Sequence, residues 1–367
     1  MKILHIINSL ATGGAEKLLF ETLPKYNALD LKADLVLLNG ADTSFLKELQ
    51  KHDCCEIFIW GTGSPYHPKF ILKLIPFFKK YDLVHVHLFP ANYFAAFAKL
   101  ISFSKTPLVF TEHNTSNRRF RNTWFNAVNK QVYKIYSRII CITEEVRLVV
   151  KKKTQIAPDK LVVINNGVDL IKFTEAEPLS RQKIDVSLRS EDFLLIQVSS
   201  FTKQKDQATV IRALSHLPKN VKLLLAGEGP LRAEHEDLVR DLSLTERVFF
   251  LGNRTDVPNL LKTCDAVVLS SHYEGLSLAS IEGMASGKPF LASDVPGLRE
   301  VVAEAGLLFP QGDHKKLAEK IEQLRIDPVF YDTVSQWGEK RASCFDIDQM
   351  VEKHITLYRN LIKSRRS

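Results

Sequence analysis

The sequence predicts an α/β protein made of two Rossmann-like, doubly wound domains facing a cleft. Short β-branched and apolar runs alternate with longer amphipathic stretches, the pattern of βαβ units around parallel sheets. A charged stretch at 169–192, which contains Pro178, lacks this alternation and indicates a junction between two halves. The length of 367 residues is enough for two domains of ordinary size.

The predicted strands fall into two sets, one for each domain. In the first half they are Lys2–Ile7, Asp34–Leu38, Glu56–Trp60, Leu83–His87, Leu108–Glu112, Ile139–Ile142 and Leu161–Ile164. In the second half they are Phe193–Val198, Val221–Ala226, Val248–Leu251, Ala266–Ser270, Phe290–Ser293 and Leu307–Phe309. We therefore place the first domain at 1–168 and the second at 169–345, followed by a final helix that includes Met350–Ile362.

Composition limits the class of protein. The chain is 45% hydrophobic and 25% charged, which is ordinary for a globular protein. No apolar run approaches the roughly 20 residues needed to span a bilayer. The first ten residues are interpreted as a buried strand and not as a signal peptide. The five cysteines include no CxxC pair, which favours a reducing cytosol over disulfides or a structural zinc.

The net charge of +8 is concentrated in the first half of the chain. Residues 1–170 contain 23 Lys and Arg against 14 Asp and Glu (+9), whereas residues 171–367 contain 27 against 28 (−1). A basic half attracts phosphate-bearing lipid or nucleic acid. Because no nucleic-acid-binding module is recognised, we expect no nucleic acid and favour an anionic membrane surface. The segment Arg118–Lys134, which interleaves cations and aromatics, is a candidate contact.

The segment His272–Pro289 carries the most chemical information. A helix is predicted to begin near Ser277, where free N–H groups and a positive dipole end suit a diphosphate, and to stop at Gly287 and Pro289. Glu274 precedes this anion site, and Glu282 lies about 7 Å along the helix axis at about 1.5 Å per residue. The two carboxylates can therefore bind hydroxyl groups on opposite sides of a diphosphate.

Further polar motifs follow predicted strands. Gly13 and Gly14 precede a predicted helix, where glycine lets backbone approach a ligand closely. They do not form the dinucleotide GxGxxG fingerprint. His113 ends a strand, where a neutral imidazole can bind a hydroxyl. Gly227-Glu228 and Arg254 lie in later strand-end loops, although ordinary loop positions would explain each of these motifs taken singly.

His85 and His87 alternate along one predicted strand, so both imidazoles point to the same face. Two histidines are part of many metal sites, but no third ligand stands out nearby in the sequence. We interpret them as structural polar residues, with metal binding as the alternative.

The motifs, in this order, resemble the retaining GT-B glycosyltransferases of family 4, which act in bacterial capsule, lipopolysaccharide and other envelope polysaccharide biosynthesis. The resemblance covers nearly the whole chain and implies a nucleotide-sugar site in the second domain. It also implies that helix 346–367 packs back on the first domain. The catalytic residues expected from it are Glu274, His113 and Lys205. The expected donor-binding residues are Gly13, Gly14, Ser200, Lys205, Gly227, Glu228, Arg254, Glu274, Gly275, Leu276, Ser277, Leu278 and Glu282.

One position departs from the family pattern. The family places an arginine five residues before the lysine that corresponds to Lys205, and the two cations clamp the donor diphosphate. Ser200 stands at the arginine position. A missing bidentate contact costs roughly 1–3 kcal/mol of binding. Lys203 or Arg254 would have to supply the charge, or the donor binds more weakly.

The resemblance implies transfer of a hexose or N-acetylhexosamine, with retention, from a nucleotide diphosphate sugar to a glycan hydroxyl. UDP is the expected nucleotide, and a glycan or polyprenyl-diphosphate-linked acceptor is expected because it is anionic and held at the membrane. We expect no cofactor, no metal, and a cytoplasmic enzyme peripheral to the inner face of the membrane. An inverting transferase or a sugar-nucleotide epimerase on the same fold is the alternative. A Rossmann dehydrogenase and a nucleic-acid-binding protein are less favoured.

Overall fold

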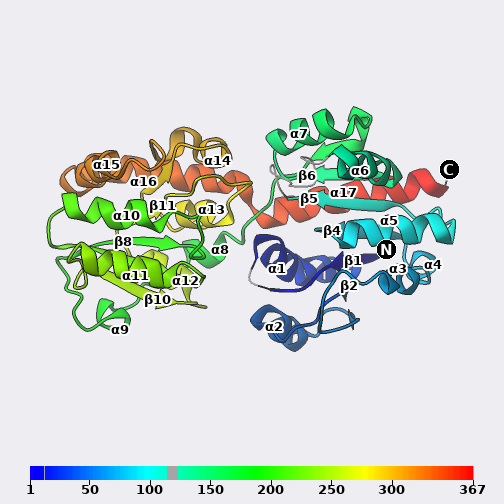
Figure 1. The fold of residues 1–367 in the computed structure, drawn as a ribbon, viewed down its shortest axis with the longest axis horizontal. Helices are drawn as coiled ribbons and strands as arrows, with labels where there is room; N and C mark the ends of the chain where they lie inside the picture. Colours follow the sequence, from blue (N-terminus) through cyan, green and yellow to red (C-terminus); the bar gives the residue numbers. More distant parts are fainter. Residues whose placement is uncertain (12, 114–122, 367) are drawn as a thin grey trace. The chain divides into compact units, whose positions relative to one another are not determined.

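The computed structural model describes residues 1–11, 13–113 and 123–366. It divides into two compact units: unit 1 comprises Met1–Gly167 and Ile347–Ser367, and unit 2 comprises Val168–Asp346. Each unit is built around its own parallel sheet (Figure 1). This confirms the predicted pair of Rossmann-like α/β folds.

The sheet of unit 1 has seven parallel strands in the order β3-β2-β1-β4-β5-β6-β7. They are β1 (Lys2–Ile7), β2 (Lys32–Leu37), β3 (Ile57–Ile59), β4 (Leu83–His87), β5 (Leu108–Glu112), β6 (Arg138–Cys141) and β7 (Leu161–Val163). The helices are α1 (Gly14–Ala28), α2 (Ser44–His52), α3 (Lys69–Leu74), α4 (Phe77–Lys80), α5 (Ala91–Ser102), α6 (Thr123–Ile135), α7 (Glu144–Thr154) and α17 (Ile347–Arg366).

One face of this sheet packs against α1, α2 and α17. Ile3 and Ile7 of β1 lie in a single buried cluster with Leu19 of α1 and with Val351 and Tyr358 of α17. The strands are mostly apolar because a parallel sheet is buried on both sides, and the few polar side chains on them, such as His5 and His85, are buried as well. Helix α17 is therefore part of the core of unit 1, although 179 residues of unit 2 separate it from the rest of that unit.

The sheet of unit 2 has six parallel strands in the order β10-β9-β8-β11-β12-β13. They are β8 (Phe193–Val198), β9 (Val221–Ala226), β10 (Val248–Gly252), β11 (Ala266–Leu269), β12 (Phe290–Ser293) and β13 (Leu307–Phe309). The helices are α8 (Ile171–Thr174), α9 (Arg181–Ile184), α10 (Gln207–Ala213), α11 (Arg232–Asp241), α12 (Val257–Thr263), α13 (Leu278–Ala285), α14 (Leu298–Val302), α15 (His314–Ile326) and α16 (Pro328–Ala342).

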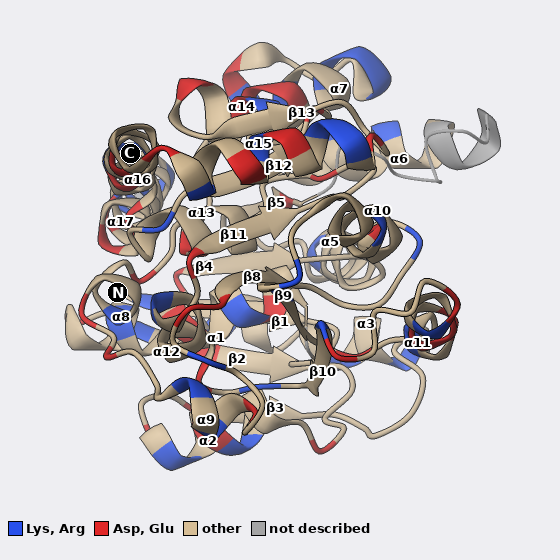
Figure 2. Cartoon of the chain, turned by 90° about the vertical axis from the view of Figure 1, so that its left-hand side faces the viewer, with Lys and Arg blue, Asp and Glu red and all other residues tan. Residues whose placement is uncertain are grey.

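Charge is kept out of the central strands of unit 2 and differs between the units. Strands β8, β11 and β12 carry no Lys, Arg, Asp or Glu and are tan in Figure 2. Unit 1 contains 28 Lys and Arg against 15 Asp and Glu (+13), and unit 2 contains 22 against 27 (−5). Within the described residues, no helix combines the length and the hydropathy that a bilayer crossing requires.

Candidate active site

The strand order of unit 2 reverses between β8 and β11. From β8 the chain proceeds to β9 and β10 on one side, and from β11 it proceeds to β12 and β13 on the other. In open parallel sheets, ligands bind at this position, beyond the carboxyl ends of the strands. The two loops that leave it are residues 199–206, after β8, and residues 270–277, after β11. Lys205 and Glu274 lie in these two loops.

Lys205 and Glu274 form an ion pair. The Lys205 Nζ to Glu274 Oε1 distance is 2.5 Å, and Ser271 Oγ donates a hydrogen bond of 2.6 Å to the same carboxylate oxygen. The Lys205 side chain is 19% exposed and that of Glu274 only 7%. A carboxylate this deeply buried needs such partners, because removing its charge from water without compensation costs about several kcal/mol.

A hydrogen-bond network fixes the backbone of Lys205 to the ends of the two strands. Gln197, in β8, donates from Nε2 to the Lys205 carbonyl at 2.9 Å. Ser270, which follows β11, donates from Oγ to the Asp206 carbonyl at 2.7 Å. His272 N donates to the Gln204 carbonyl at 2.7 Å and so joins the two loops directly. The ion pair is therefore held in place from both strands.

The backbone of Glu274 rests on a glycine in the loop after β12. Gly297 has φ +84°, and a Cβ atom there would lie 2.3 Å from the Glu274 carbonyl oxygen and 2.4 Å from that of Gly275. Only glycine fits this position, because it tolerates both the positive φ and the close approach. The Pro296-Gly297 dipeptide, a turn signal that our sequence analysis did not use, marks it.

Helix α13 begins beside Glu274, as predicted. Ser277 caps it by accepting a hydrogen bond from Ser280 N at 3.4 Å. The first N–H groups of a helix have no acceptor within the helix, so this end suits an anion. Gly275, Leu276 and Leu278 form the backbone around this turn, and the side chains of Leu276, Ser277 and Leu278 are buried. Glu282 lies further along α13 and is 5% exposed.

The loops after β8 and β9 touch through a glycine. Gly227 has φ +140°, and a Cβ atom there would lie 2.1 Å from the Ser199 carbonyl oxygen. Ser200 follows and is exposed. Glu228 forms an ion pair with Arg232 of the next helix. Ser200 therefore lies in the same loop as Lys205, and Gly227 and Glu228 lie in the neighbouring loop after β9.

Arg254 pairs with a carboxylate of its own loop. Its Nε and Nη2 donate to the two carboxylate oxygens of Asp256 at 2.8 and 2.6 Å. The hydrogen bond to Asp256 raises the pKa of Arg254. This bidentate pair weakens the case that Arg254 replaces the expected arginine. Lys203 is exposed and lies in the same loop as Lys205.

Three predicted site residues belong to unit 1. Gly13 caps α1 and Gly14 is its first residue. His113 directly follows β5; its Nε2 is buried and has no hydrogen-bond partner among the described residues. Burial lowers the pKa of His113 to about 4, so the imidazole is neutral at pH 7. The neighbouring Thr12 and residues 114–122 lie outside the described part of the chain, as do Arg118, Arg119 and Arg121 of the basic-aromatic segment.

Comparison with protein families gives a match for each unit. Residues 12–172 match the model described as Glycosyltransferase Family 4, and residues 180–342 match the one described as Glycosyl transferases group 1. Together these matches take in most of both units.

Similar full-length proteins are known. The chain is 27% identical over 305 residues to the UDP-Gal:alpha-D-GlcNAc-diphosphoundecaprenol alpha-1,3-galactosyltransferase of Escherichia coli, covering 78% of this chain and 77% of that one. It is 27% identical over 359 residues to the N-acetylgalactosamine-N,N'-diacetylbacillosaminyl-diphospho-undecaprenol 4-alpha-N-acetylgalactosaminyltransferase of Campylobacter jejuni, covering 93% and 94%.

Solved structures agree on the fold. The crystal structure of Anabaena HepE in complex with UDP superposes with a TM-score of 0.85 at 24% identity, covering 98% of this chain and 100% of that one. The lipopolysaccharide biosynthesis glycosyltransferase WaaG superposes with a TM-score of 0.73 at 17% identity, covering 97% and 99%.

The ion pair generates a prediction about stability. Lys205→Met leaves the buried Glu274 carboxylate without its cation, so it should lower the unfolding temperature of unit 2. In the double variant with Glu274→Gln no charge is stranded, and part of the loss should be recovered, with a coupling of about 1–3 kcal/mol. Thermal unfolding followed by circular dichroism measures this. Strictly additive effects would show that the pair does not couple in solution.

Proposed function

The chain belongs to the GT-B glycosyltransferases with a family 4 domain and a group 1 domain, and we propose that it transfers a hexose or N-acetylhexosamine from a nucleotide diphosphate sugar to a glycan hydroxyl. The observation that carries the proposal is the Lys205–Glu274 pair at the strand-order reversal of unit 2, next to the start of α13. A cation and a helix N-terminus suit a diphosphate, and the carboxylate suits sugar hydroxyls.

In this proposal Lys205 binds the diphosphate without releasing Glu274. A lysine ammonium has three donors. One of them contacts Glu274 Oε1, so the others can bind phosphate oxygens. Glu274 Oε2 has one long contact, 3.5 Å from Gln204 Nε2, and can accept hydrogen bonds from hydroxyls of the transferred sugar. Glu282 would bind the ribose diol and His113 a hydroxyl of the sugar.

The proposed reaction breaks the bond between the sugar anomeric carbon and the diphosphate oxygen and forms a bond to the acceptor oxygen. Negative charge then develops on the departing diphosphate. Lys205 and the N–H groups of Leu278 and Ala279 would stabilise that charge. In many enzymes such electrostatic stabilisation of the transition state is the largest single contribution to the rate enhancement. The acceptor proton passes to the departing phosphate. We propose that these protein groups serve in place of a metal in the donor site.

The relatives guide the choice of substrates. The name of the E. coli relative gives UDP-Gal as its donor, and both relatives' names give diphosphoundecaprenol-linked acceptors and alpha linkages. We propose UDP as the nucleotide here, a lipid-linked or envelope glycan as the acceptor and an alpha-linked product. From an alpha-linked UDP sugar, that product means retention.

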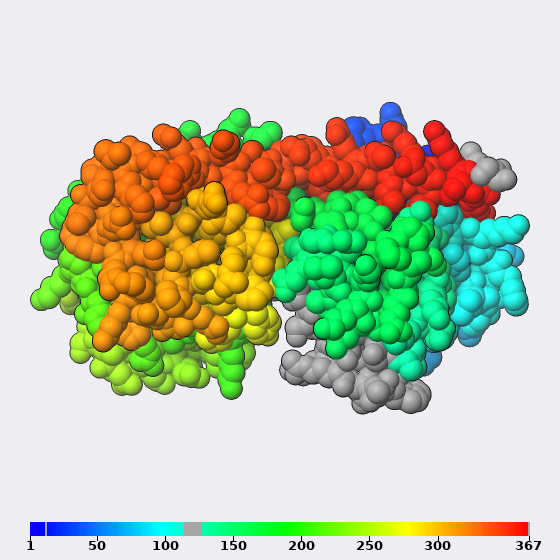
Figure 3. Space-filling model, turned by 90° about the horizontal axis from the view of Figure 1, so that it is seen from above, coloured from blue at the N-terminus to red at the C-terminus, as the bar shows by residue number. Residues whose placement is uncertain are grey.

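An exposed apolar and basic surface on unit 1 supports a peripheral position at a membrane. Phe97, Leu100, Ile101 and Phe103, at the end of α5, are 38%, 52%, 52% and 92% exposed. We call these four side chains the α5 apolar patch. Exposed apolar side chains gathered in this way mark interaction surfaces. In Figure 3 the cyan surface that contains α5 lies next to the red end of α17.

Several basic residues lie near the loop that follows the α5 apolar patch. Ser104 Oγ and Thr106 Oγ1 both donate to the Phe78 carbonyl, at 3.2 and 2.6 Å, which places this loop beside Lys79 and Lys80. Arg365 of α17 reaches Thr106 Oγ1 at 3.2 Å. Lys99 lies near Lys160 and Arg365, since burial and then the charges of these two residues lower the pKa of Lys99 to about 8. Lys105 is exposed and follows Ser104 in the same loop. Apolar side chains among cations suit an anionic bilayer.

The proposed site predicts large effects on transfer. Glu274→Gln and Lys205→Ala should each lower kcat by about 100-fold or more, because each removes a group that acts on the transferred sugar or on the leaving diphosphate. Thr202→Ala, in the same loop, is the matched control and should change kcat by less than about threefold. Turnover of a UDP-sugar panel measures this. Comparable losses in all three variants would point to damage of the loop and against the assigned roles.

The substitution Ser200→Arg is expected to increase the affinity for UDP. Ser200 is exposed and occupies the position where the family has a cation. An arginine there should strengthen UDP binding about fivefold to 100-fold through a bidentate phosphate contact worth about 1–3 kcal/mol. Isothermal titration with UDP measures the change, with Ser200→Gln as a size-matched control. Unchanged affinity in Ser200→Arg would place the diphosphate away from this loop.

Membrane binding is expected to depend on anionic lipid and on the α5 apolar patch. The protein should cosediment with vesicles containing about one third anionic lipid more strongly than with neutral vesicles, since each Lys near such a surface contributes about 1 kcal/mol. Ile101→Ser with Phe103→Ser, and separately Lys79→Glu with Lys80→Glu, should weaken binding about tenfold or more. Val186→Ser, which changes an 88% exposed side chain of unit 2, should not. Equal binding to both vesicle types would refute the surface.

A further inference from the structure

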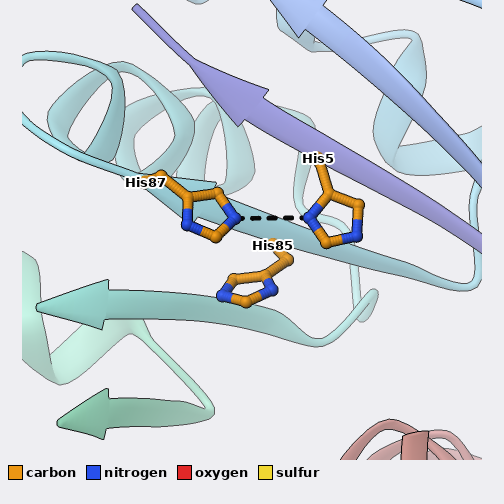
Figure 4. Close-up of side chains that lie close together, drawn as sticks. All are labelled: His5, His85 and His87. Atoms are coloured by element: carbon orange, nitrogen blue, oxygen red, sulfur yellow. Dashed lines mark hydrogen bonds between the residues drawn. The ribbon is translucent and has the colours of Figure 1, made fainter. Parts of the chain in front are cut away.

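Three imidazoles meet on one face of the sheet of unit 1. His5 comes from the middle of β1, and His85 and His87 come from the adjacent β4. The parallel register pairs His5 with His85, and the two-residue period of a strand puts His87 on the same face. Figure 4 shows the three rings converging from these two strands. The sequence interpretation found no third ligand because His5 lies 80 residues before His85 and approaches it only through strand pairing.

The three rings are close enough to share an ion after a small shift of the ring of His85, and one pair of nitrogens already has the spacing of a zinc site. One ring nitrogen from each histidine lies within 4.8 Å of those of the other two. His5 Nδ1 and His87 Nε2 are 3.3 Å apart. Two imidazoles on a tetrahedral zinc, with bonds of about 2.0–2.1 Å, stand about 3.3–3.4 Å apart. We propose that His5, His85 and His87 bind one divalent transition ion of the zinc class, with a water-derived ligand in the fourth position.

His85 has the outer contacts that a metal-bound histidine requires. Its Nδ1 lies 2.6 Å from the Tyr358 hydroxyl, on α17, and its Nε2 lies 2.7 Å from Thr111 Oγ1, on β5. Whichever ring nitrogen binds the ion, the other keeps a hydroxyl partner that orients the ring. The ion would displace one of these two hydroxyls.

The other two histidines are under-satisfied without an ion. His5 Nε2 and His87 Nδ1 are buried and have no hydrogen-bond partner among the described residues. The inner nitrogens of these two rings contact each other. The alternative arrangement is a shared N–H···N hydrogen bond between these two nitrogens, and metal retention distinguishes the two.

The chemistry of the three groups favours a borderline metal over a hard one. Imidazole nitrogen suits zinc, copper, nickel and cobalt, whereas magnesium and calcium prefer oxygen. A neutral imidazole offers the lone pair of its unprotonated ring nitrogen to such an ion. A hydroxide in the fourth position would offset part of the buried charge.

The expected role of the ion is structural. It would join β1 to β4 and, through Tyr358, brace α17 against the sheet of unit 1. All of these residues belong to unit 1, and none is among the groups assigned to the donor diphosphate. The metal site therefore neither rests on the proposed transferase function nor supports it.

The test measures metal retention in the full chain without a polyhistidine tag. Protein is produced in defined medium containing Zn²⁺ or Co²⁺, and is also refolded from guanidinium with the same ions, because the buried site needs loading before the fold closes. After an EDTA wash, mass spectrometry should find about one ion per chain, and Co²⁺ should give the visible absorption of a tetrahedral site. The unfolding temperature should rise by about 5 °C with the ion bound.

Matched variants locate the ion. His5→Asn and His87→Gln should each reduce retention about tenfold or more, while circular dichroism shows that the variants are folded. His216→Asn disrupts an exposed histidine pair of unit 2, in which Nε2 lies 3.1 Å from His314 Nδ1, and should leave retention unchanged. The proposal is overturned if the wild type retains no ion by either loading route, if retention survives both unit 1 variants, or if His216→Asn abolishes it.

Discussion

The ion pair between Lys205 and Glu274 is the constraint on which the site of unit 2 depends. It joins the loops that follow the adjacent strands β8 and β11, from which the chain continues to opposite sides of the sheet. Both side chains are mostly shielded from water. Each charge would be costly to hold there alone. The surrounding structure serves to keep the two side chains together: Gln197 and Ser270 hold one backbone, and Gly297 makes room for the other. A ligand therefore meets a preorganised cation and carboxylate.

The two units differ in where they place polar and charged side chains relative to their sheets. Unit 2 excludes charge from its central strands and admits it only in loops at their carboxyl ends. Unit 1 places three histidines within the interface between its sheet and its helices, against Tyr26 and Tyr358. Buried polar groups in such a place need directional partners, which fixes the helices more specifically than apolar contact does. The two units also differ in net charge, +13 against −5.

Most of the fold follows from the sequence, because buried parallel strands are short apolar runs separated by helices. The predicted strands that coincide with observed ones are Lys2–Ile7, Leu83–His87, Leu108–Glu112, Phe193–Val198, Val221–Ala226, Phe290–Ser293 and Leu307–Phe309. The remaining predicted strands differ from the observed ones by one or two residues at one or both ends. Those end differences arise because hydrogen bonding to a neighbouring strand, and not hydropathy, decides where pairing stops. The start of α13 near Ser277 was also predicted, and the structure adds that Ser277 itself caps the helix.

The candidate site could be predicted only as a set of loops. Positions such as Gly227 and Glu274 lie at strand ends, which periodicity reveals. Side-chain contacts depend on strand order, register and side-chain direction. Examples are the Lys205–Glu274 ion pair, the Arg254–Asp256 ion pair and the proximity of His5 to His85. Strand order, register and side-chain direction cannot be inferred from the residues around each position in a single sequence. Gly297 was missed for the same reason, since the carbonyls it accommodates come from another loop.

The contribution of α17 to unit 1 has a consequence for biosynthesis. Val351, Ile355 and Tyr358 complete the apolar layer over β1, yet the ribosome makes them only after the whole of unit 2. Unit 2, whose sequence is continuous, can fold as soon as it emerges. The earlier-made unit must wait with the part of this face that α17 covers still open, so the nascent chain exposes that part until α17 emerges. Unit 2 can therefore complete its core before unit 1 does, although it is synthesised later.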